Sequence, residues 1–284
     1  MNLKEVELKQ KVSLKNYTTI RIGGEAKNFF IVRSVEGIKS ILEKFSNSFY
    51  ILGKGSNILV KDTLIKKPII KLSDNFDYIK KNGNFFEVGA ATSLSKLLKF
   101  CIKNKLSGLE NLAGIPATVG GLIFMNASAF GREISTFLEA IEIVDEYRNL
   151  KKLTKNEIRF FYRGCSLKNS IILRAWFKFL NVENLKDKIK YFLVKRYLTQ
   201  DLSFPSCGCI FKNPPSYSAG FLIEACGLKG FRKNDAQISL KHANFIINLG
   251  KAKYRDVDYL IKIAKEEVYK KFGIILEEEI KRWY

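Results

Sequence analysis

The chain has 284 residues, of which 46% are hydrophobic and 27% charged, values typical of a globular protein and not of a disordered one. Lysine and arginine outnumber aspartate and glutamate by 49 to 28, but the lysines lie singly or in pairs along the whole chain, which favours solvated faces over a nucleic-acid site. The single histidine and five irregularly spaced cysteines argue against a histidine-rich zinc site, a zinc ribbon and a disulfide scaffold.

The hydrophobic pattern alternates between strand and helix periods, without repeats or low-complexity linkers. In chain order it predicts strand 28–32, helix 35–45, strands 49–52, 58–60, 69–72, 77–80 and 85–88, helix 93–103, helix 118–126, strands 141–145 and 171–180, helices 184–198 and 219–225, strand 244–247, helix 256–272 and strand 274–280. Ser93 suits an N-cap, Pro116 a first helical turn, and Gly273 a helix end. We therefore predict an α+β fold with several small sheets.

No targeting or membrane segment is predicted. Residues 1–10 are charged and lack an apolar core, and no run approaches the ~18–20 apolar residues of a membrane span. We expect a cytoplasmic monomer that binds no metal, membrane or nucleic acid.

Two glycine-rich loops are candidate anion sites. Residues 53–57 (GKGSN) lie between two apolar strands and expose successive N–H groups, although a plain turn explains them as well, and they match neither a Walker nor a GxGxxG pattern. Residues 113–121 (AGIPATVGG) present a helix N-terminus suited to a diphosphate, although close helix packing explains Gly120 and Gly121 equally well. Two such loops in one half of a chain favour a dinucleotide.

Three further spots carry reactive side chains. Residues 206–214 contain Cys209, a thiol that is mostly protonated at pH 7 and can donate a proton, although a free cysteine is more often a buried hydrophobe. Arg163, after Tyr162, can clamp a carboxylate or form a surface ion pair. The glutamates at 277–279 are either a functional set or a solvated charge run.

These segments, in this order, resemble the family of UDP-N-acetylenolpyruvoylglucosamine reductases. The resemblance covers nearly the whole chain, through residues 16–24, 52–57, 113–121, 126–131, 162–163, 208–214, 219–224, 227–230, 242–245, 248 and 276–280. It implies a fold like that of vanillyl-alcohol oxidase, FAD as cofactor, NADPH as cosubstrate and a UDP-sugar substrate. The implied reaction gives UDP-N-acetylmuramate for peptidoglycan synthesis, with a hydride passing from reduced FAD to the vinyl carbon of the substrate. The length suggests the compact type of the family.

The resemblance also assigns roles residue by residue. Cys209 would be the proton donor, in a position where the family more often has serine; Arg163 would be the cation that stabilises the developing charge, and Glu279 would assist. Tyr162, Arg163, Lys212 and Asn213 would hold the substrate. FAD would lie on Gly53, Lys54, Gly55, Ser56, Asn57, Ile115, Pro116, Ala117, Thr118, Gly120, Gly121 and Asn126. The implied domains are an FAD-binding lobe at 1–72 joined by a C-terminal strand at 271–284, a second FAD-binding lobe at 73–183 and a substrate-binding domain at 184–270.

The chain departs from the family pattern at a few positions. Lys54, Ala117 and Ser128 stand where glycines are common, and Gly164 and Cys165 precede Ser166 where one residue is expected. The alternative function is another FAD-dependent oxidase or dehydrogenase of the same fold, which would ignore a UDP-sugar. A basic nucleic-acid binder would instead bind DNA or RNA with a steep dependence on salt.

Overall fold

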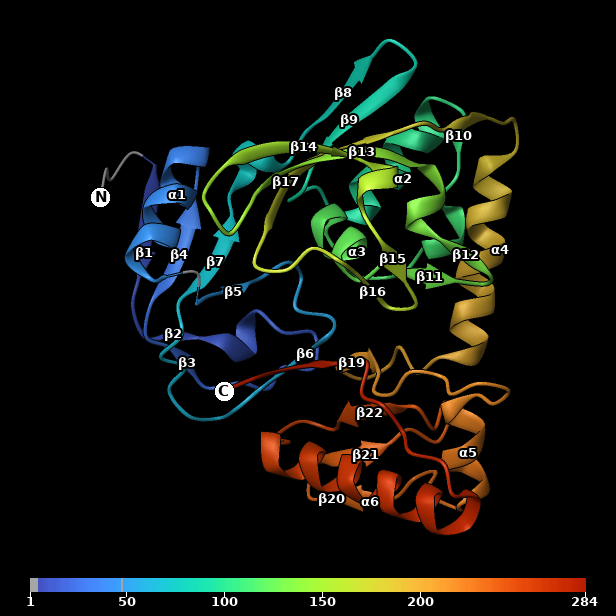
Figure 1. Cartoon of the computed structure of the whole chain (residues 1–284). Coiled ribbons are helices and arrows are strands. Elements are labelled where there is room, and N and C mark those ends of the chain that lie inside the picture. Colours follow the sequence, from blue (N-terminus) through green and yellow to red (C-terminus); the bar gives the residue numbers. More distant parts are fainter. Residues whose placement is uncertain (1–4, 47) are drawn as a thin grey trace. The chain divides into compact units, whose positions relative to one another are not determined.

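A computed structural model describes residues 5–46 and 48–284 (Figure 1). By their internal contacts the residues form two compact units. Unit 1 comprises Met1–Gln10, Asn28–Lys54 and Lys67–Val194, and unit 2 comprises Lys11–Lys27, Gly55–Lys66 and Lys195–Tyr284. The three-lobe division implied by the family resemblance stays a prediction.

Unit 1 contains a four-stranded sheet in the order β1 (Val6–Lys9), β4 (Phe29–Val32), β7 (Ile69–Leu72) and β5 (Tyr50–Ile51). β4, β7 and β5 are parallel, and β1 is antiparallel to β4. Helix α1 (Val35–Lys44) begins after Ser34, whose hydroxyl accepts a hydrogen bond from Gly37 N at 3.0 Å. The apolar face of α1 contributes Ile38, Ile41 and Leu42 to a buried cluster with residues of this sheet.

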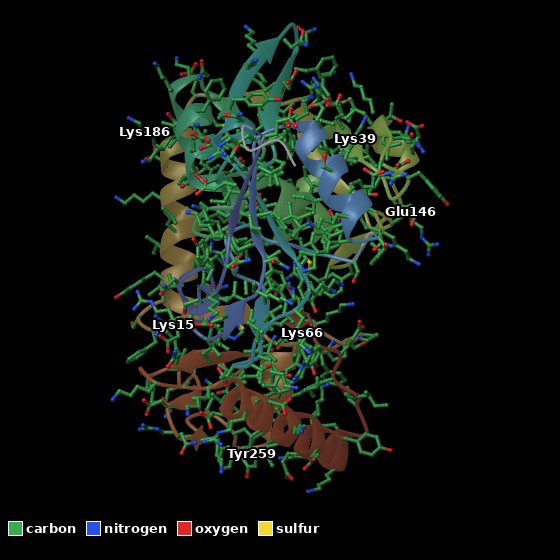
Figure 2. The ribbon with its side chains drawn as sticks, turned by 90° about the vertical axis from the view of Figure 1, so that its left-hand side faces the viewer. Lys15, Lys39, Lys66, Glu146, Lys186 and Tyr259 are labelled. Atoms are coloured by element: carbon green, nitrogen blue, oxygen red, sulfur yellow. The ribbon has the colours of Figure 1, made fainter. Side chains whose placement is uncertain are left out.

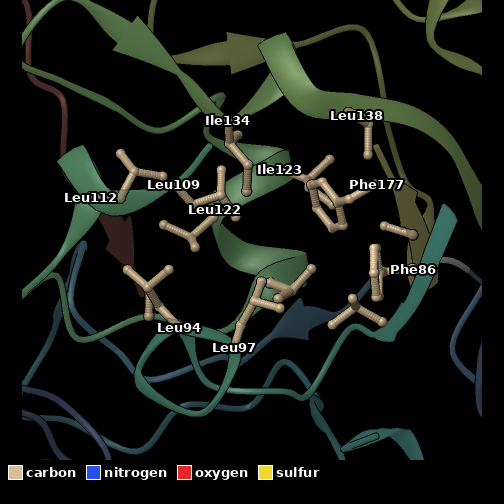
Figure 3. Packing of buried hydrophobic residues seen from close by; sticks show 14 of the residues in the cluster. Phe86, Leu94, Leu97, Leu109, Leu112, Leu122, Ile123, Ile134, Leu138 and Phe177 are labelled. Carbon is tan, nitrogen blue, oxygen red and sulfur yellow. The ribbon is translucent and has the colours of Figure 1, made fainter. Parts of the chain in front are cut away.

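A larger apolar cluster of unit 1 lies beside an antiparallel five-stranded sheet. The order is β14 (Leu150–Thr154), β13 (Leu138–Val144), β17 (Ile171–Phe177), β9 (Phe85–Gly89) and β8 (Ile79–Asn82). Figure 3 shows side chains from α2 (Leu94–Lys103), α3 (Val119–Phe124) and β17 packed together in this cluster. Each fully buried leucine or phenylalanine contributes about 1.5–3 kcal/mol.

Short two-stranded pairs complete unit 1. They are β10 (Leu106–Ser107) with β18 (Leu180–Asn181), β11 (Ser128–Ala129) with β12 (Arg132–Glu133), and β15 (Phe160–Phe161) with β16 (Gly164–Cys165). Helix α4 (Leu185–Thr199) begins in unit 1, where Leu185 and Ile189 are buried, and its residues from 195 onward belong to unit 2.

Unit 2 contains a second four-stranded sheet, in the order β19 (Ser206–Cys209), β22 (Phe245–Asn248), β21 (Ala236–Ile238) and β20 (Arg232–Lys233). α5 (Ala219–Ala225) and α6 (Tyr254–Phe272) bury their apolar faces in the same cluster as residues of this sheet. Two further strand pairs complete unit 2. β2 (Val12–Ser13) is antiparallel to β3 (Glu25–Ala26), and β6 (Ile58–Val60) is parallel to β23 (Lys281–Trp283).

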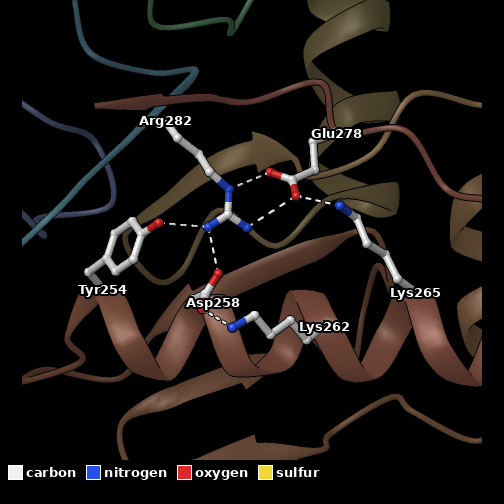
Figure 4. Close-up of polar contacts among 6 residues, drawn as sticks. All are labelled: Tyr254, Asp258, Lys262, Lys265, Glu278 and Arg282. Carbon is white, nitrogen blue, oxygen red and sulfur yellow. Dashed lines mark hydrogen bonds and ion pairs between the residues drawn. The ribbon is translucent and has the colours of Figure 1, made fainter. Parts of the chain in front are cut away.

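An ion-pair network joins the C-terminal segment to α6 (Figure 4). Arg282 Nε donates to Glu278 Oε2 at 2.6 Å, and Arg282 Nη1 donates to Asp258 Oδ1 at 2.5 Å and to the Tyr254 hydroxyl at 2.7 Å. Lys265 Nζ donates to Glu278 Oε1 at 2.6 Å. The network holds the chain in place between α6 and β23.

The predicted α+β class is confirmed, and most predicted elements are found within one or two residues of their expected bounds. The predicted strand 274–280 is wrong. Instead Phe211 and Glu278 form one isolated bridge, and the pairing with β6 starts only at Lys281. The predicted strand 77–80 begins at Ile79, because Asp77 closes a 3-10 helix. The predicted strand 171–180 ends at Phe177, and residues 180–181 pair with β10 instead.

Most lysines lie on solvated faces, as the charge pattern predicts. In the four lysine pairs at 66–67, 80–81, 151–152 and 270–271, every lysine is exposed except Lys67, which is half-buried over the Tyr50 ring. Three of the exposed lysines, Lys15, Lys66 and Lys186, are labelled in Figure 2. Among the described residues, no helix is long and apolar enough to cross a membrane, no three metal-binding side chains cluster, and no disulfide forms.

Candidate active site

The predicted cofactor loop at 53–57 is shaped by close backbone contacts. In unit 1, a Cβ on Gly53 would lie 2.7 Å from Thr118 Oγ1, so only glycine fits there. In unit 2, Gly55 has a φ of +67°, and a Cβ would lie 2.0 Å from the Tyr17 carbonyl oxygen. Close packing therefore explains why both positions are glycine: Gly53 lies against the Thr118 side chain, and the buried Gly55 lies against the backbone of Tyr17.

The second predicted loop ends in α3 as expected, but its N–H groups are not free. Thr118 is the N-cap, because its hydroxyl accepts a hydrogen bond from Gly121 N at 3.4 Å, so Pro116 lies before the helix and not in its first turn. Val119 N and Gly120 N donate to the carbonyl oxygens of Thr92 and Ala90 at 2.8 and 2.9 Å. The expectation of a helix end with unused donors is therefore wrong: these N–H groups hold α3 to the neighbouring chain.

The structure brings together Asn126 and the Tyr162–Arg163 turn in unit 1. Asn126 is fully buried, and its Nδ2 donates to Glu133 Oε2 at 2.8 Å and to Phe161 O at 3.3 Å. Asn126 Oδ1 is buried and accepts no hydrogen bond from the described residues. The side chain of Asn126 thus supports the hairpin that carries Tyr162 and Arg163.

Arg163 occupies the two-residue turn between β15 and β16, with a φ of +61°. Its Nη1 donates to the Ser128 hydroxyl at 2.7 Å and to the Ser128 carbonyl at 2.9 Å. The departure from glycine at Ser128 therefore provides a side-chain partner for the predicted catalytic cation. A left-handed conformation is uncommon for arginine and costs of order 1 kcal/mol or more, which a tightly bonded guanidinium helps to offset.

Cys209 ends β19 in unit 2. A register shift between Ser206 and Cys209, with Gly208 at a φ of +75°, distinguishes the two neighbouring cysteines. Cys207 is 1% exposed, and burial raises the pKa of its thiol to about 12, whereas Cys209 is half-buried. Of the two, only Cys209 is accessible enough to donate a proton to a substrate.

The three consecutive glutamates have three different surroundings. Glu277 accepts a hydrogen bond from Lys212 Nζ at 2.5 Å, and Glu278 belongs to the Arg282 network. Glu279 is half-buried, and its N–H donates to Ile210 O at 2.8 Å, directly after Cys209 in the chain. The structure thus brings the predicted pair Cys209 and Glu279 onto adjacent segments of unit 2, although 70 positions separate them.

Asn57 and Asn244 fix these two segments. Asn57 Nδ2 donates to Glu279 O at 3.2 Å, and Asn57 O accepts from Lys281 N at 2.9 Å. Asn244 is buried; its Oδ1 accepts from Phe211 N at 2.9 Å and its Nδ2 donates to Phe211 O at 2.8 Å. Asn244 therefore holds the backbone that follows Cys209, a role that residue type alone did not reveal.

The predicted substrate-binding residues of unit 2 are both engaged. Lys212 is 19% exposed and pairs with Glu277, which is 70% exposed. Asn213 is exposed, and its Oδ1 accepts a hydrogen bond from Ala219 N, the first residue of α5, at 3.0 Å. An anionic substrate would have to compete with a solvated glutamate for Lys212.

Sequence reasoning also missed Arg196, a buried residue of α4 in unit 2. Arg196 is 6% exposed, and its Nη1 donates to Gln200 Oε1 at 2.9 Å. Burial lowers the pKa of its guanidinium, and the charge of a Cys209 thiolate opposes that shift. A cation within electrostatic range of a cysteine favours the thiolate form of that cysteine. The only sequence signal was a lone arginine in a lysine-rich helix.

Comparison with known proteins defines the class and then the family. Residues 26–149 match the family model described as "FAD binding domain", and residues 200–283 match "UDP-N-acetylenolpyruvoylglucosamine reductase, C-terminal domain". The fold and these domains make the chain an FAD-dependent oxidoreductase. It belongs to the UDP-N-acetylenolpyruvoylglucosamine reductase family, which confirms the resemblance seen in the sequence.

Individual relatives agree over nearly full length. The UDP-N-acetylenolpyruvoylglucosamine reductase of Chloroherpeton thalassium is 40% identical, over 99% of this chain and 95% of the relative. The reductase of Caldicellulosiruptor bescii is 41% identical, over 94% of this chain and 88% of the relative. The crystal structure of the Thermus caldophilus reductase is 35% identical, with a TM-score of 0.86 over 98% of this chain and all of that one.

The residues present fit the diphosphate of FAD. Gly53 packs against the Thr118 hydroxyl, and the exposed Lys54 adds positive charge to the same loop, which suits a phosphate group. The individual FAD-binding residues at the two loops stay a prediction.

Proposed function

We propose that this protein reduces the enolpyruvyl group of UDP-N-acetylglucosamine enolpyruvate to give UDP-N-acetylmuramate, with NADPH as the electron source. Membership of the family supports the substrate, and the adjacency of Cys209 and Glu279 carries the proposal. The product serves peptidoglycan synthesis, and we infer a monomer in the cytoplasm.

FAD, when bound, supplies the hydride that the vinyl carbon of the substrate accepts. Adding a hydride to that carbon leaves an electron pair on the neighbouring carbon, next to the carboxylate. A cation beside the carboxylate stabilises this charge more in the transition state than in the ground state. We assign that role to Arg163, whose guanidinium is oriented by Ser128.

The reaction is completed by a proton. The Cys209 S–H bond breaks as the new C–H bond forms, and the electron pair of the S–H bond remains on sulfur as a thiolate. Arg196 stabilises that thiolate, and Glu279, held by backbone bonds to Ile210 and Asn57, assists at the substrate. Tyr162, Lys212 and Asn213 position the substrate.

An anaerobic absorbance experiment tests the function. Purified protein with FAD is expected to show a flavin spectrum that bleaches on adding NADPH and recovers on adding UDP-N-acetylglucosamine enolpyruvate. Bleaching without recovery would indicate another flavoenzyme of this fold, and absence of flavin binding would contradict the proposal.

Changing Ser128→Gly is expected to slow substrate reduction about three- to tenfold, because Arg163 loses one of two hydrogen bonds to residue 128. Flavin reduction by NADPH should be unchanged, since Arg163 acts on the substrate. Stopped-flow measurement of each half-reaction checks this. The control is Ser170→Gly, because the Ser170 hydroxyl donates to the nearby Lys168 carbonyl. Equal rates in Ser128→Gly and the control would mean that Ser128 does not orient Arg163.

A further inference from the structure

Two lysines of unit 1 lie beside the loop that follows β5. Lys71 is in β7, the parallel neighbour of β5, and its Nζ donates to Gly53 O at 3.4 Å. The register brings the two residues near each other: Ile51 pairs with Ile70, and Leu52 N donates to Ile70 O at 2.9 Å, so Lys71 lies level with Leu52, the residue before Gly53. This is the carboxyl edge of parallel strands, where such sheets commonly bind ligands.

The charge at this edge is unbalanced. Lys71 is half-buried; burial lowers the pKa of its ammonium group, and the positive charge of Lys54 lowers it further. In residues 5–46 and 48–284, no carboxylate forms an ion pair with Lys54 or Lys71. By contrast, Arg174, whose side chain is 35% exposed, binds Glu87 and Glu142. Lys71 therefore pays a desolvation cost that no protein anion offsets.

The loop residue beside Lys71 packs against a hydroxyl group. Gly53, whose carbonyl Lys71 contacts, lies so close to Thr118 Oγ1 that a Cβ would approach it to 2.7 Å. An ammonium group, a glycine backbone and a hydroxyl thus lie close together. These groups match the oxygens of a phosphate in charge and in hydrogen bonding.

We propose that Lys71, together with Lys54, binds the diphosphate of FAD and is a cofactor-binding residue additional to those indicated by the sequence motifs. The proposal rests on the proposed function insofar as FAD is the ligand. A bound diphosphate supplies the negative charge that the two lysines lack, so burial of Lys71 is unfavourable in the empty protein and favourable in the loaded one.

Changing Lys71→Met tests this with two measurements on the full-length protein. FAD titrated into flavin-free protein is expected to bind about 10- to 100-fold more weakly, since one charge-assisted contact is lost. Added salt should weaken FAD binding to the wild type more than to the variant. The melting temperature of the flavin-free protein should stay level or rise. The matched control, Lys67→Met, removes a neighbouring half-buried lysine and should leave FAD affinity unchanged.

Three results would overturn the proposal. One is a lower melting temperature of the flavin-free Lys71→Met protein with unchanged FAD affinity, which would make Lys71 structural. Another is unchanged FAD affinity with weakened NADPH binding, which would assign the lysine to the phosphates of NADPH. The third concerns inorganic pyrophosphate, which is expected to raise the melting temperature of the flavin-free wild type but not that of Lys71→Met. An equal rise in melting temperature, or no rise in either protein, would reject the site. Because this arm needs no flavin, it still decides on Lys71 if the protein fails to bind FAD and the proposed function fails.

Discussion

Replacing Cys209 by alanine is expected to slow reduction of the enolpyruvyl substrate by about 10²- to 10⁴-fold, the usual contribution of a positioned general acid. Reduction of the enzyme by NADPH should keep its wild-type rate, because that half-reaction needs no proton from Cys209. Rapid-mixing absorbance at the flavin band measures the two half-reactions separately. Cys209→Ser should retain appreciable turnover, since a hydroxyl can replace the thiol as donor.

The control for Cys209 is Cys226→Ala, which removes another half-buried thiol of unit 2. It should leave both half-reactions unchanged. Equal slowing of both half-reactions in Cys209→Ala would show that Cys209 has a structural role, and unchanged substrate reduction would require a different proton donor.

Changing Arg282→Met is expected to lower the free energy of unfolding by about 3–5 kcal/mol, the cost of removing one partner from a buried ion pair. The Arg282, Glu278 and Asp258 side chains are only 16%, 17% and 20% exposed, so water cannot replace the lost cation well. Urea unfolding of the flavin-free protein measures the difference. The control is Arg232→Met, where a 52% exposed arginine pairs with Asp235 and a loss below about 1 kcal/mol is expected.

The Arg282 effect should depend on pH. Burial alone would raise the pKa of Glu278 and Asp258, but hydrogen bonds from Arg282 and a lysine outweigh it, and both carboxyl pKa values are lowered. Stability from such groups is present above their unfolded pKa of about 4 and is lost as the pH falls through the folded value. The stabilities of the wild type and Arg282→Met should therefore converge progressively as the pH falls below about 4. A difference that stays constant down to the acid unfolding of the wild type would contradict the network's role.

Helices with local signals at their ends were predictable from the sequence. Ser93 caps α2 as expected, and Gly273 ends α6 in the left-handed conformation. The start of α6 was placed two residues late, because Asp256 is not its first residue: its carboxylate reaches back to Lys253 N at 2.9 Å. A capping contact of this kind joins residues three positions apart, and the hydrophobic periodicity alone does not show it.

Tertiary pairings were not predictable. The segment 274–280 was expected to be a strand, yet within it only Glu278 forms a bridge, with Phe211, although Lys212 N and Glu279 N also donate to backbone carbonyls across the two segments. In the same way, no local feature distinguishes the three glutamates: Glu277 and Glu279 contact the segment 210–212, whereas Glu278 binds Arg282. The contacts of Ser128 with Arg163 and of Lys71 with Gly53 likewise depend on hairpin and sheet register.

The pairing of β6 with β23 has a consequence for biosynthesis. β6 ends at residue 60, but its strand partner begins at residue 281, so more than 200 further residues must leave the ribosome before the two can meet. Residues of unit 1 extend only to 194 and can assemble earlier. If translation stops shortly before residue 281, β6 keeps an open edge and Asn57 lacks its Lys281 partner. We expect such an incomplete chain to be a target for chaperones and quality-control proteases.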